Sequence, residues 1–167
     1  MKRQAGYTYL LLIFLVALLS AALAAAGDVW ATTRQREKEI ELIFAGDAIR
    51  LAIASYYNVG SAKQYPAQLS DLLKDPRFPE TRRHLRQLYP DPFAPASAVA
   101  WIEIKAPQGG IMGVASASET APLKRQGFPQ VDQVFEERAL LLKEKMRYRD
   151  WEFVYLPIQN PASTARH

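Results

Sequence analysis

The residue types that most often carry catalysis are scarce in this chain. None of its 167 residues is cysteine, which excludes a thiolate nucleophile, a disulfide and a cysteine metal site. Its two histidines are His84 and the last residue, His167, which argues against a site of several histidines. As a general base, His84 would need an orienting carboxylate and a nucleophile within reach. Because no serine or threonine lies in a recognisable nucleophile motif, we expect no catalytic residue, metal or cofactor, and therefore no enzyme.

Charged clusters offer binding chemistry instead. Arg82, Arg83 and Arg86 lie in TRRHLRQLY and could bind the acidic face of a partner or a lipid phosphate, or form the solvated face of a helix. The net charge of +4 comes from no single basic tract, so no nucleic-acid partner is expected. The Gln-Gly-Gly segment at 108–110 lacks the Lys and Ser or Thr of a phosphate loop and predicts a hairpin turn. Four acidic residues lack the spacing of a calcium loop: Asp91, Glu103, Glu119 and Asp132.

An apolar segment near the N-terminus determines where these groups lie. Residues 7–26 are Tyr, Leu, Ile, Phe, Val and Ala, apart from Thr8 and Ser20. A helix of this length reaches roughly 30 Å, which matches the hydrocarbon core of a bilayer. Lys2 and Arg3 precede the segment, and by the positive-inside rule they keep the N-terminus in the cytoplasm. We therefore expect one membrane span that sends the rest of the chain across the membrane.

Three interpretations of this segment are open. It could be a secretory signal peptide, because the alanines at 24–26 provide the small residues that signal peptidase needs, and cleavage after Ala26 would release a periplasmic binding module. It could be an uncleaved membrane anchor. The third interpretation depends on Gly6, which ends a short basic leader and is followed at once by Tyr7, Thr8 and an unbroken apolar run.

This last arrangement resembles the class III signal of type IV pilins and type II secretion pseudopilins. The resemblance implies that a prepilin peptidase cuts between Gly6 and Tyr7, that the amine of Tyr7 is methylated, and that the apolar helix is kept in the mature protein. Most members of the family carry a Glu four residues after the new N-terminus, implied to pair with the amine of a neighbouring subunit. Leu11 occupies that position here and cannot form the pair. Some minor pseudopilins, thought to sit at the fibre tip, also lack this Glu, so the resemblance is to a minor subunit.

The helical pattern continues beyond the apolar segment. No proline occurs before Pro66, and Asn58 begins an Asn-Val-Gly stop, so one helix is expected from near Tyr7 to near Asn58. Gly27 and Gly46 are weak points, each costing ~1 kcal/mol relative to alanine. In the second half, spacings of three and four predict the stripe that packs under a head. This stripe contains Ile40, Ile43, Phe44, Asp47, Leu51 and Ala54.

The remaining chain is expected to form a small α+β head. Short helices are predicted in YPAQLSDLLKD and ETRRHLRQLYPDPF, and a further helix in VDQVFEERALLLKEKM. Strands are predicted in AVAWIEIKAP, in IMGVASAS after the turn at 108–110, and in WEFVYLP. The YP step with its leucine repeat, and the later Asp-Pro-Phe step, resemble the region after the long helix in major pseudopilins. The tail is expected to be disordered.

The expected fold class is thus α+β, and pilin-like by resemblance: a long N-terminal helix packed on a small antiparallel sheet. The expected divisions are a leader at 1–6, the membrane or fibre-core half of the helix at 7–27, its amphipathic half at 28–58, the head at 59–157 and the tail at 158–167. The resemblance implies a structural subunit of a bacterial type II secretion or type IV pilus-like fibre, single-pass in the inner membrane with a periplasmic head. The implied partners are other pilin or pseudopilin subunits, prepilin peptidase, the inner-membrane assembly platform and the lipid bilayer.

Overall fold

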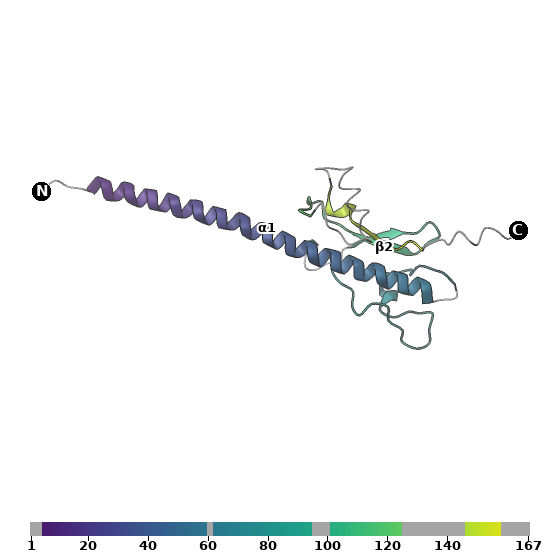
Figure 1. Cartoon of the computed structure of the whole chain (residues 1–167). Helices are drawn as coiled ribbons and strands as arrows, with labels where there is room; N and C mark the ends of the chain where they lie inside the picture. Colours follow the sequence, from purple (N-terminus) through teal and green to yellow (C-terminus); the bar gives the residue numbers. More distant parts are fainter. Residues whose placement is uncertain (1–4, 60–61, 95–100, 125–145, 158–167) are drawn as a thin grey trace. The chain divides into compact units, whose positions relative to one another are not determined.

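The structure is a computed structural model. It describes residues 5–59, 62–94, 101–124 and 146–157 (Figure 1). The chain forms two compact units, Met1–Glu37 and Lys38–His167. Helix α1, Ala5–Val59, begins in the first unit and ends in the second.

Helix α1 confirms the long helix expected from near Tyr7 to near Asn58. Its 55 residues contain no proline and are rich in alanine and leucine, which have high helix propensity. Gly27 does not interrupt it, because one weak position inside a long cooperative helix removes too little free energy to break the helix.

In the first unit the helix carries a long run of exposed apolar side chains, interrupted only by Thr8 and Ser20. The large ones from Tyr7 to Leu23 are 48–73% exposed. An 18-residue window has a mean hydropathy of 2.6, and none of its residues is buried. The hydroxyl of Ser20 donates to the carbonyl of Val16 at 2.8 Å, the internal pairing that a polar group needs in lipid. By length and composition, this helix can cross a membrane.

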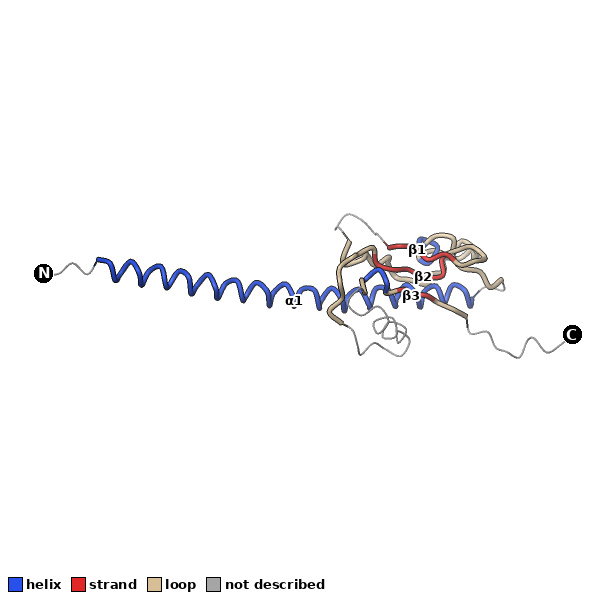
Figure 2. Tube along the Cα trace, turned by 90° about the horizontal axis from the view of Figure 1, so that it is seen from above, coloured by secondary structure: helices blue, strands red, loops and turns tan. Residues whose placement is uncertain are grey.

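The second unit contains a three-stranded antiparallel sheet in the order β1-β2-β3, which lies beside the C-terminal half of α1 (Figure 2). The strands are β1, Trp101–Lys105, β2, Ile111–Ser116, and β3, Glu152–Val154, and all three were expected from the sequence. Val114 in the central strand lies opposite Phe153. The α+β class is therefore confirmed.

The expected hairpin turn joins β1 to β2. Gly109 and Gly110 have φ values of 93° and 81°, a left-handed backbone that glycine adopts at no steric cost. The N–H of Ala106 donates to the carbonyl of Gly110 at 2.9 Å, which closes the turn. The hairpin turn predicted for the Gln-Gly-Gly segment is therefore confirmed, and the two glycines supply its left-handed backbone.

The core of the head is built on the helix face opposite to the expected one. The predicted stripe is wrong for Ile40, Phe44 and Leu51, which are 71%, 60% and 64% exposed. Its other members are half-buried, namely Ile43, Asp47 and Ala54, and Ile43 packs against the edge of the core. Both faces of this half carry apolar residues at helical spacing, so spacing alone could not identify the face that the sheet covers. The buried α1 residues are Leu42, Ala45, Ile49, Ala52, Ile53 and Tyr56. They form one core with Trp101, Ile111, Val114, Met146, Tyr148, Trp151 and Phe153.

Gly46 lies where the ring of Phe153 on β3 contacts α1. A Cβ atom at this position would overlap the ring of Phe153, which is itself fully buried. The glycine is a weak point for the isolated helix, but its missing side chain is the space that Phe153 fills. Its low helix propensity is therefore the cost of bringing the sheet onto the helix backbone.

Two connections differ from the helices expected there. YPAQLSDLLKD forms only the 3-10 turn η1, Leu69–Leu72, with both leucines buried. ETRRHLRQLYPDPF is irregular, so the helix predicted for it is wrong. The physical reason is that its backbone bonds to another segment: the N–H groups of His84 and Leu85 both donate to the carbonyl of Leu72, at 2.8 and 2.9 Å.

Part of the sequence prediction lies outside the described residues. The helix expected in VDQVFEERALLLKEKM falls there, except for Met146, which is buried. The tail at 158–167 falls there as well. The described chain resumes at Met146, and the 3-10 turn η4, Tyr148–Asp150, precedes β3.

Candidate functional site

The expected processing site lies at the start of α1. Gly6 and Tyr7 are in its first turns, and the side chains of Tyr7 and Leu11 are exposed. Lys2 and Arg3 lie outside the described residues. Cleavage between Gly6 and Tyr7, methylation of Tyr7 and the membrane orientation therefore stay predictions.

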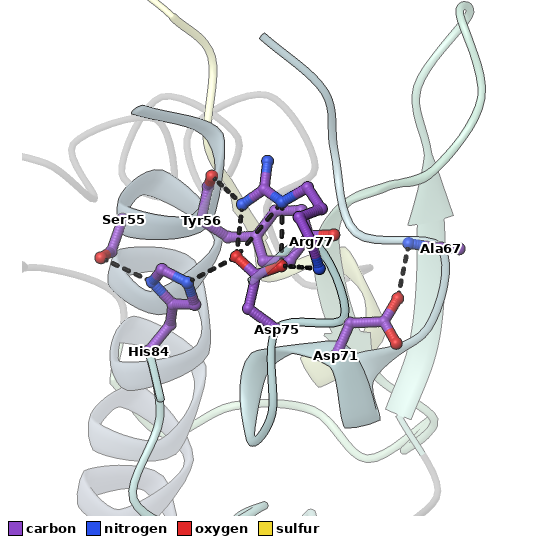
Figure 3. Close-up of polar contacts among 7 residues, drawn as sticks. All are labelled: Ser55, Tyr56, Ala67, Asp71, Asp75, Arg77 and His84. Atoms are coloured by element: carbon purple, nitrogen blue, oxygen red, sulfur yellow. Dashed lines mark hydrogen bonds and ion pairs between the residues drawn. The ribbon is translucent and has the colours of Figure 1, made fainter. Parts of the chain in front are cut away.

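A polar cluster in the head is centred on Asp75, whose side chain is fully buried (Figure 3). Two nitrogens of Arg77 contact its carboxylate, with Nε 2.9 Å from Oδ1 and Nη2 2.6 Å from Oδ2. The same Nη2 donates to the carbonyl of Tyr56 at 2.8 Å, and the guanidinium carbon lies 3.6 Å from the centroid of the Tyr56 ring. Arg77 thus joins the loop to the end of α1.

His84 links the same carboxylate to the helix (Figure 3). Its Nε2 lies 3.1 Å from Oδ2 of Asp75, and its Nδ1 lies 2.8 Å from Oγ of Ser55. His84 lies in a segment for which the sequence predicted a helix, but it is on an irregular loop and its side chain is only 1% exposed. Sequence reasoning found neither the carboxylate nor the hydroxyl, because both come from distant segments.

The pairing of charges sets the protonation of this cluster. Hydrogen bonds from the Arg77 side chain hold the pKa of Asp75 well below its ordinary value, and this effect, with smaller contributions from the Arg77 backbone and His84, outweighs burial. The same hydrogen bond raises the pKa of Arg77. Burial raises the pKa of Tyr56. At neutral pH the cluster therefore contains an ionised carboxylate paired with a guanidinium.

The hydrogen bonds connect a hydroxyl, an imidazole and a carboxylate in series, through Ser55, His84 and Asp75. Enzymes of acyl transfer use the same series as nucleophile, base and orienting carboxylate. Two features of their surroundings oppose that reaction. Ser55 lies near the C-terminal end of α1, where the N–H groups are used within the helix and the free carbonyls are partly negative, so an oxyanion there would meet acceptors instead of donors. Asp75 also shares its charge with Arg77. We therefore interpret Ser55, Tyr56, Asp75, Arg77 and His84 as a clamp, the Asp75 clamp, that holds the loop on the helix.

Two other buried carboxylates hold loops in the same manner. Oε1 of Glu39 accepts hydrogen bonds from two N–H groups at 123–124, at 2.6 and 3.1 Å, and from the hydroxyl of Tyr148 at 2.8 Å. Oδ2 of Asp91 accepts from the hydroxyl of Ser116 at 2.7 Å. Backbone N–H groups and hydroxyls satisfy these buried charges, as burial requires.

The remaining acidic residues singled out from the sequence do not gather into one site. Glu103 is exposed on β1, Glu119 pairs with Arg149, and Asp132 lies outside the described residues. Within the described ranges, no three side chains of His, Asp or Glu lie close enough together to hold a metal ion.

The arginine cluster noted in the sequence lies on the irregular loop that the Asp75 clamp holds. Arg82, Arg83 and Arg86 are all exposed. Arg83 and Arg86 line an open pocket of about 720 Å³ together with Gln87 and Tyr89. The structure therefore shows these groups on a loop with a concave surface, instead of on the helix face that the sequence suggested.

The clamp had one local signal in the sequence. Asp75 precedes a proline, and its Oδ1 accepts the N–H of Arg77 at 3.0 Å, the side-chain turn that an aspartate favours. That signal indicates a turn at Asp75 but carries no information about Ser55 or His84.

Comparison with known protein families, curated protein sequences and solved structures finds no match to this chain. A long N-terminal helix with a small antiparallel sheet is compatible with a pilin-like fold, and the apolar part of that helix is compatible with a pilin-like subunit.

Proposed function

We propose that this protein is a structural subunit, a minor pseudopilin or pilin, of a bacterial type II secretion or type IV pilus-like system. The observation that carries the proposal is the division of α1. One part is an apolar helix with no buried residue in its membrane-length window, and the other contributes to the core of a small antiparallel head. In this role the first part is held in the inner membrane with the head in the periplasm, and later leaves the bilayer to pack in a fibre.

The exposed face of the helix in the head supports an assembly role. Ile40, Phe44 and Leu51 lie within about 40° of one another around a helix with ~3.6 residues per turn, so they form one apolar face. Large apolar side chains gathered on one face mark a surface that is covered by a partner. Neighbouring subunits of a fibre would cover it.

The processing steps belong to the same proposal. Prepilin peptidase removes residues 1–6, Tyr7 becomes the N-terminus and its amine is methylated. Leu11 cannot supply the acidic partner for the amine of a neighbouring subunit, so the protein is present in few copies, at the tip of the fibre. The work is mechanical, and the protein is not an enzyme. The position of Ser55 at the negative end of α1 supports this view.

The rival interpretation is a periplasmic module released by cleavage after Ala26. Helix α1 continues through Ala26 and Gly27 into the head without a break, which favours an element kept whole in the mature protein. A released domain would begin within that helix.

The deciding experiment is to determine the mature N-terminus by mass spectrometry of the protein from native membranes. We expect a chain that begins with methylated Tyr7, and a Gly6→Ala precursor that still begins with Met1. An Ala26→Leu precursor should be processed as the unmodified chain is, because it alters only the signal-peptidase site. A mature chain that begins with Gly27 would replace the proposal by the released module. An intact Met1 in the unmodified protein would leave a static anchor.

A further inference from the structure

Three arginines of the head have no acidic partner in the described part of the chain. Arg82, Arg83 and Arg86 are exposed and form no ion pair there, whereas other arginines of the head pair with a carboxylate, as Arg77 does with Asp75. The loop at 74–86 has five basic and two acidic residues. Asp75 is already used by the clamp, and the second carboxylate, Glu80, is exposed and forms no ion pair with another described residue. The loop therefore presents net positive charge that it does not neutralise itself.

The backbone that carries these arginines is fixed. The carbonyl of Arg82 accepts the N–H of Asp75 at 3.0 Å, and the N–H of His84 is bonded to Leu72. The His84 side chain is held in the Asp75 clamp, and the next residue, Leu85, is buried in the core. Arg83 and Arg86 thus extend from anchored positions. A partner that binds them does not have to order the loop first, which lowers the entropic cost of binding.

The surface beside these arginines is concave. The pocket of about 720 Å³ is lined by Arg83, His84, Leu85, Arg86, Gln87 and Tyr89. Tyr89 is fixed at one side, since Nε1 of Trp101 donates to its carbonyl at 2.7 Å and its ring packs edge-on against Phe44 with centroids 5.4 Å apart. Guanidinium groups pair with carboxylates through two parallel hydrogen bonds, and arginine and tyrosine are the usual anchors of protein interfaces.

We propose that this pocket, the arginine pocket, is a docking site for an acidic segment of a partner protein, whose carboxylates pair with Arg83 and Arg86. The concave shape selects this occupant over an anionic membrane, because a protruding peptide can enter a pocket that a flat bilayer surface cannot fill. Gln87 and Tyr89 add a neutral amide and an aromatic ring suited to the backbone and side chains of a peptide. The proposal concerns the head alone and does not depend on the fibre role.

The test compares three forms of the full-length protein in neutral detergent micelles. The probe is a fluorescein-labelled octaglutamate peptide, followed by fluorescence anisotropy. The variants are Arg83→Gln with Arg86→Gln, and a matched control, Arg36→Gln with Lys105→Gln. The control removes the same charge from exposed residues elsewhere. Circular dichroism of each form establishes that the fold is intact, which is expected for exposed side chains.

We expect the unmodified protein to bind the peptide with an affinity that falls as salt is added. The arginine-pocket variant should bind at least about tenfold more weakly, and the control should bind as the unmodified protein does. Equal weakening in both variants would reduce the effect to net charge and overturn the proposal. So would unchanged binding in the arginine-pocket variant.

Flotation with vesicles of phosphatidylcholine and phosphatidylglycerol tests the lipid alternative, and sedimentation of the protein alone tests a second copy. If the peptide does not bind, but vesicle binding or self-association is lost in the arginine-pocket variant, the proposal is overturned. The pocket would then bind lipid or a second copy of the chain instead.

Discussion

The imidazole of His84 connects two segments of the head: Nδ1 lies 2.8 Å from Oγ of Ser55 on α1, and Nε2 lies 3.1 Å from Oδ2 of the buried Asp75. The guanidinium of Arg77 completes the arrangement by pairing with the same carboxylate. A loop without regular structure is thereby held against the helix, because the negative carboxylate of Asp75 pairs with two donors, Arg77 and His84. The arrangement explains how an irregular segment can present fixed arginines, and it makes Asp75 the residue on which the loop depends.

Asp75→Asn should lower the free energy of unfolding of the head by about 3 kcal/mol, because it leaves the guanidinium of Arg77 without its buried counter-ion. Chemical denaturation of the full chain in micelles, followed by tryptophan fluorescence, measures the change. Asp71→Asn is the matched control. Asp71 accepts the N–H of Gln68 at 3.0 Å in an exposed turn, so its loss should cost only about 1 kcal/mol. Equal effects of the two substitutions would contradict a central role for Asp75.

The same carboxylate predicts a dependence of stability on pH. Its pKa is lower in the folded than in the unfolded chain, where it is about 3.8, so the unfolded state binds more protons as the pH falls. The stabilisation is complete well above pH 3.8 and is lost as the pH falls through the lowered folded value. The difference in stability between the unmodified protein and Asp75→Asn should therefore shrink on acidification from about pH 5 downward. A difference that stays constant to the lowest pH at which the protein is folded would show that the charge of Asp75 does not stabilise the head.

Substitution of Ser55 separates the clamp from a catalytic relay. Ser55→Ala removes one exposed hydrogen bond and should change the free energy of unfolding by less than about 1 kcal/mol, whereas His84→Ala should cost about 2 kcal/mol through the loss of a buried hydrogen-bonded ring. Neither variant should alter the hydrolysis of p-nitrophenyl acetate or labelling by a fluorophosphonate. Fluorophosphonate labelling of the unmodified protein that Ser55→Ala abolishes would show instead that Ser55 is a nucleophile.

Gly46→Ala should destabilise the head, although alanine is the better helix former. The new methyl group would overlap the ring of Phe153, and overpacking of this kind costs about 1–3 kcal/mol. Gly46→Ala should cost less stability in a Phe153→Leu background than in the unmodified protein, because the smaller side chain leaves room for the methyl group. A double-mutant cycle measures this coupling. Gly27→Ala is the control, since a Cβ there meets nothing within 4 Å and should only favour the helix. Additive effects of the substitutions at 46 and 153 would show that the contact does not limit this position.

Local features of the fold could be predicted from the sequence, and relationships between distant segments could not. The strands and their hairpin follow from alternation and from two glycines, which are local signals. The buried face of α1 could not be chosen, because Leu42 and Phe44 both belong to apolar sets at helical spacing and only the position of the sheet distinguishes them. The partners of His84 are 29 and 9 residues away in the chain, and no periodicity connects them. The processing site stays a prediction of the resemblance.

The exposed helix face yields the prediction that bears most directly on assembly. Replacing Ile40, Phe44 and Leu51 together by glutamine should lower the stability of the head by only about 1 kcal/mol, because none of the three is buried and the one ring pair that is lost joins Phe44 to Tyr89. If the chain is the fibre subunit proposed above, the same triple substitution should prevent co-purification with fibres from cells that express the whole secretion or pilus system, since neighbouring subunits would then cover this apolar face.

Ile49→Ala is the control for that experiment, because it should lower the stability of the head by about 2–5 kcal/mol while leaving the exposed face unchanged. A folded fraction of this variant should still enter the fibre, so stability and assembly would be affected by different faces of one helix. If the triple variant entered fibres as efficiently as the unmodified chain, the face of Ile40, Phe44 and Leu51 would have no part in assembly. The apolar first half of α1 would then have to account for packing alone.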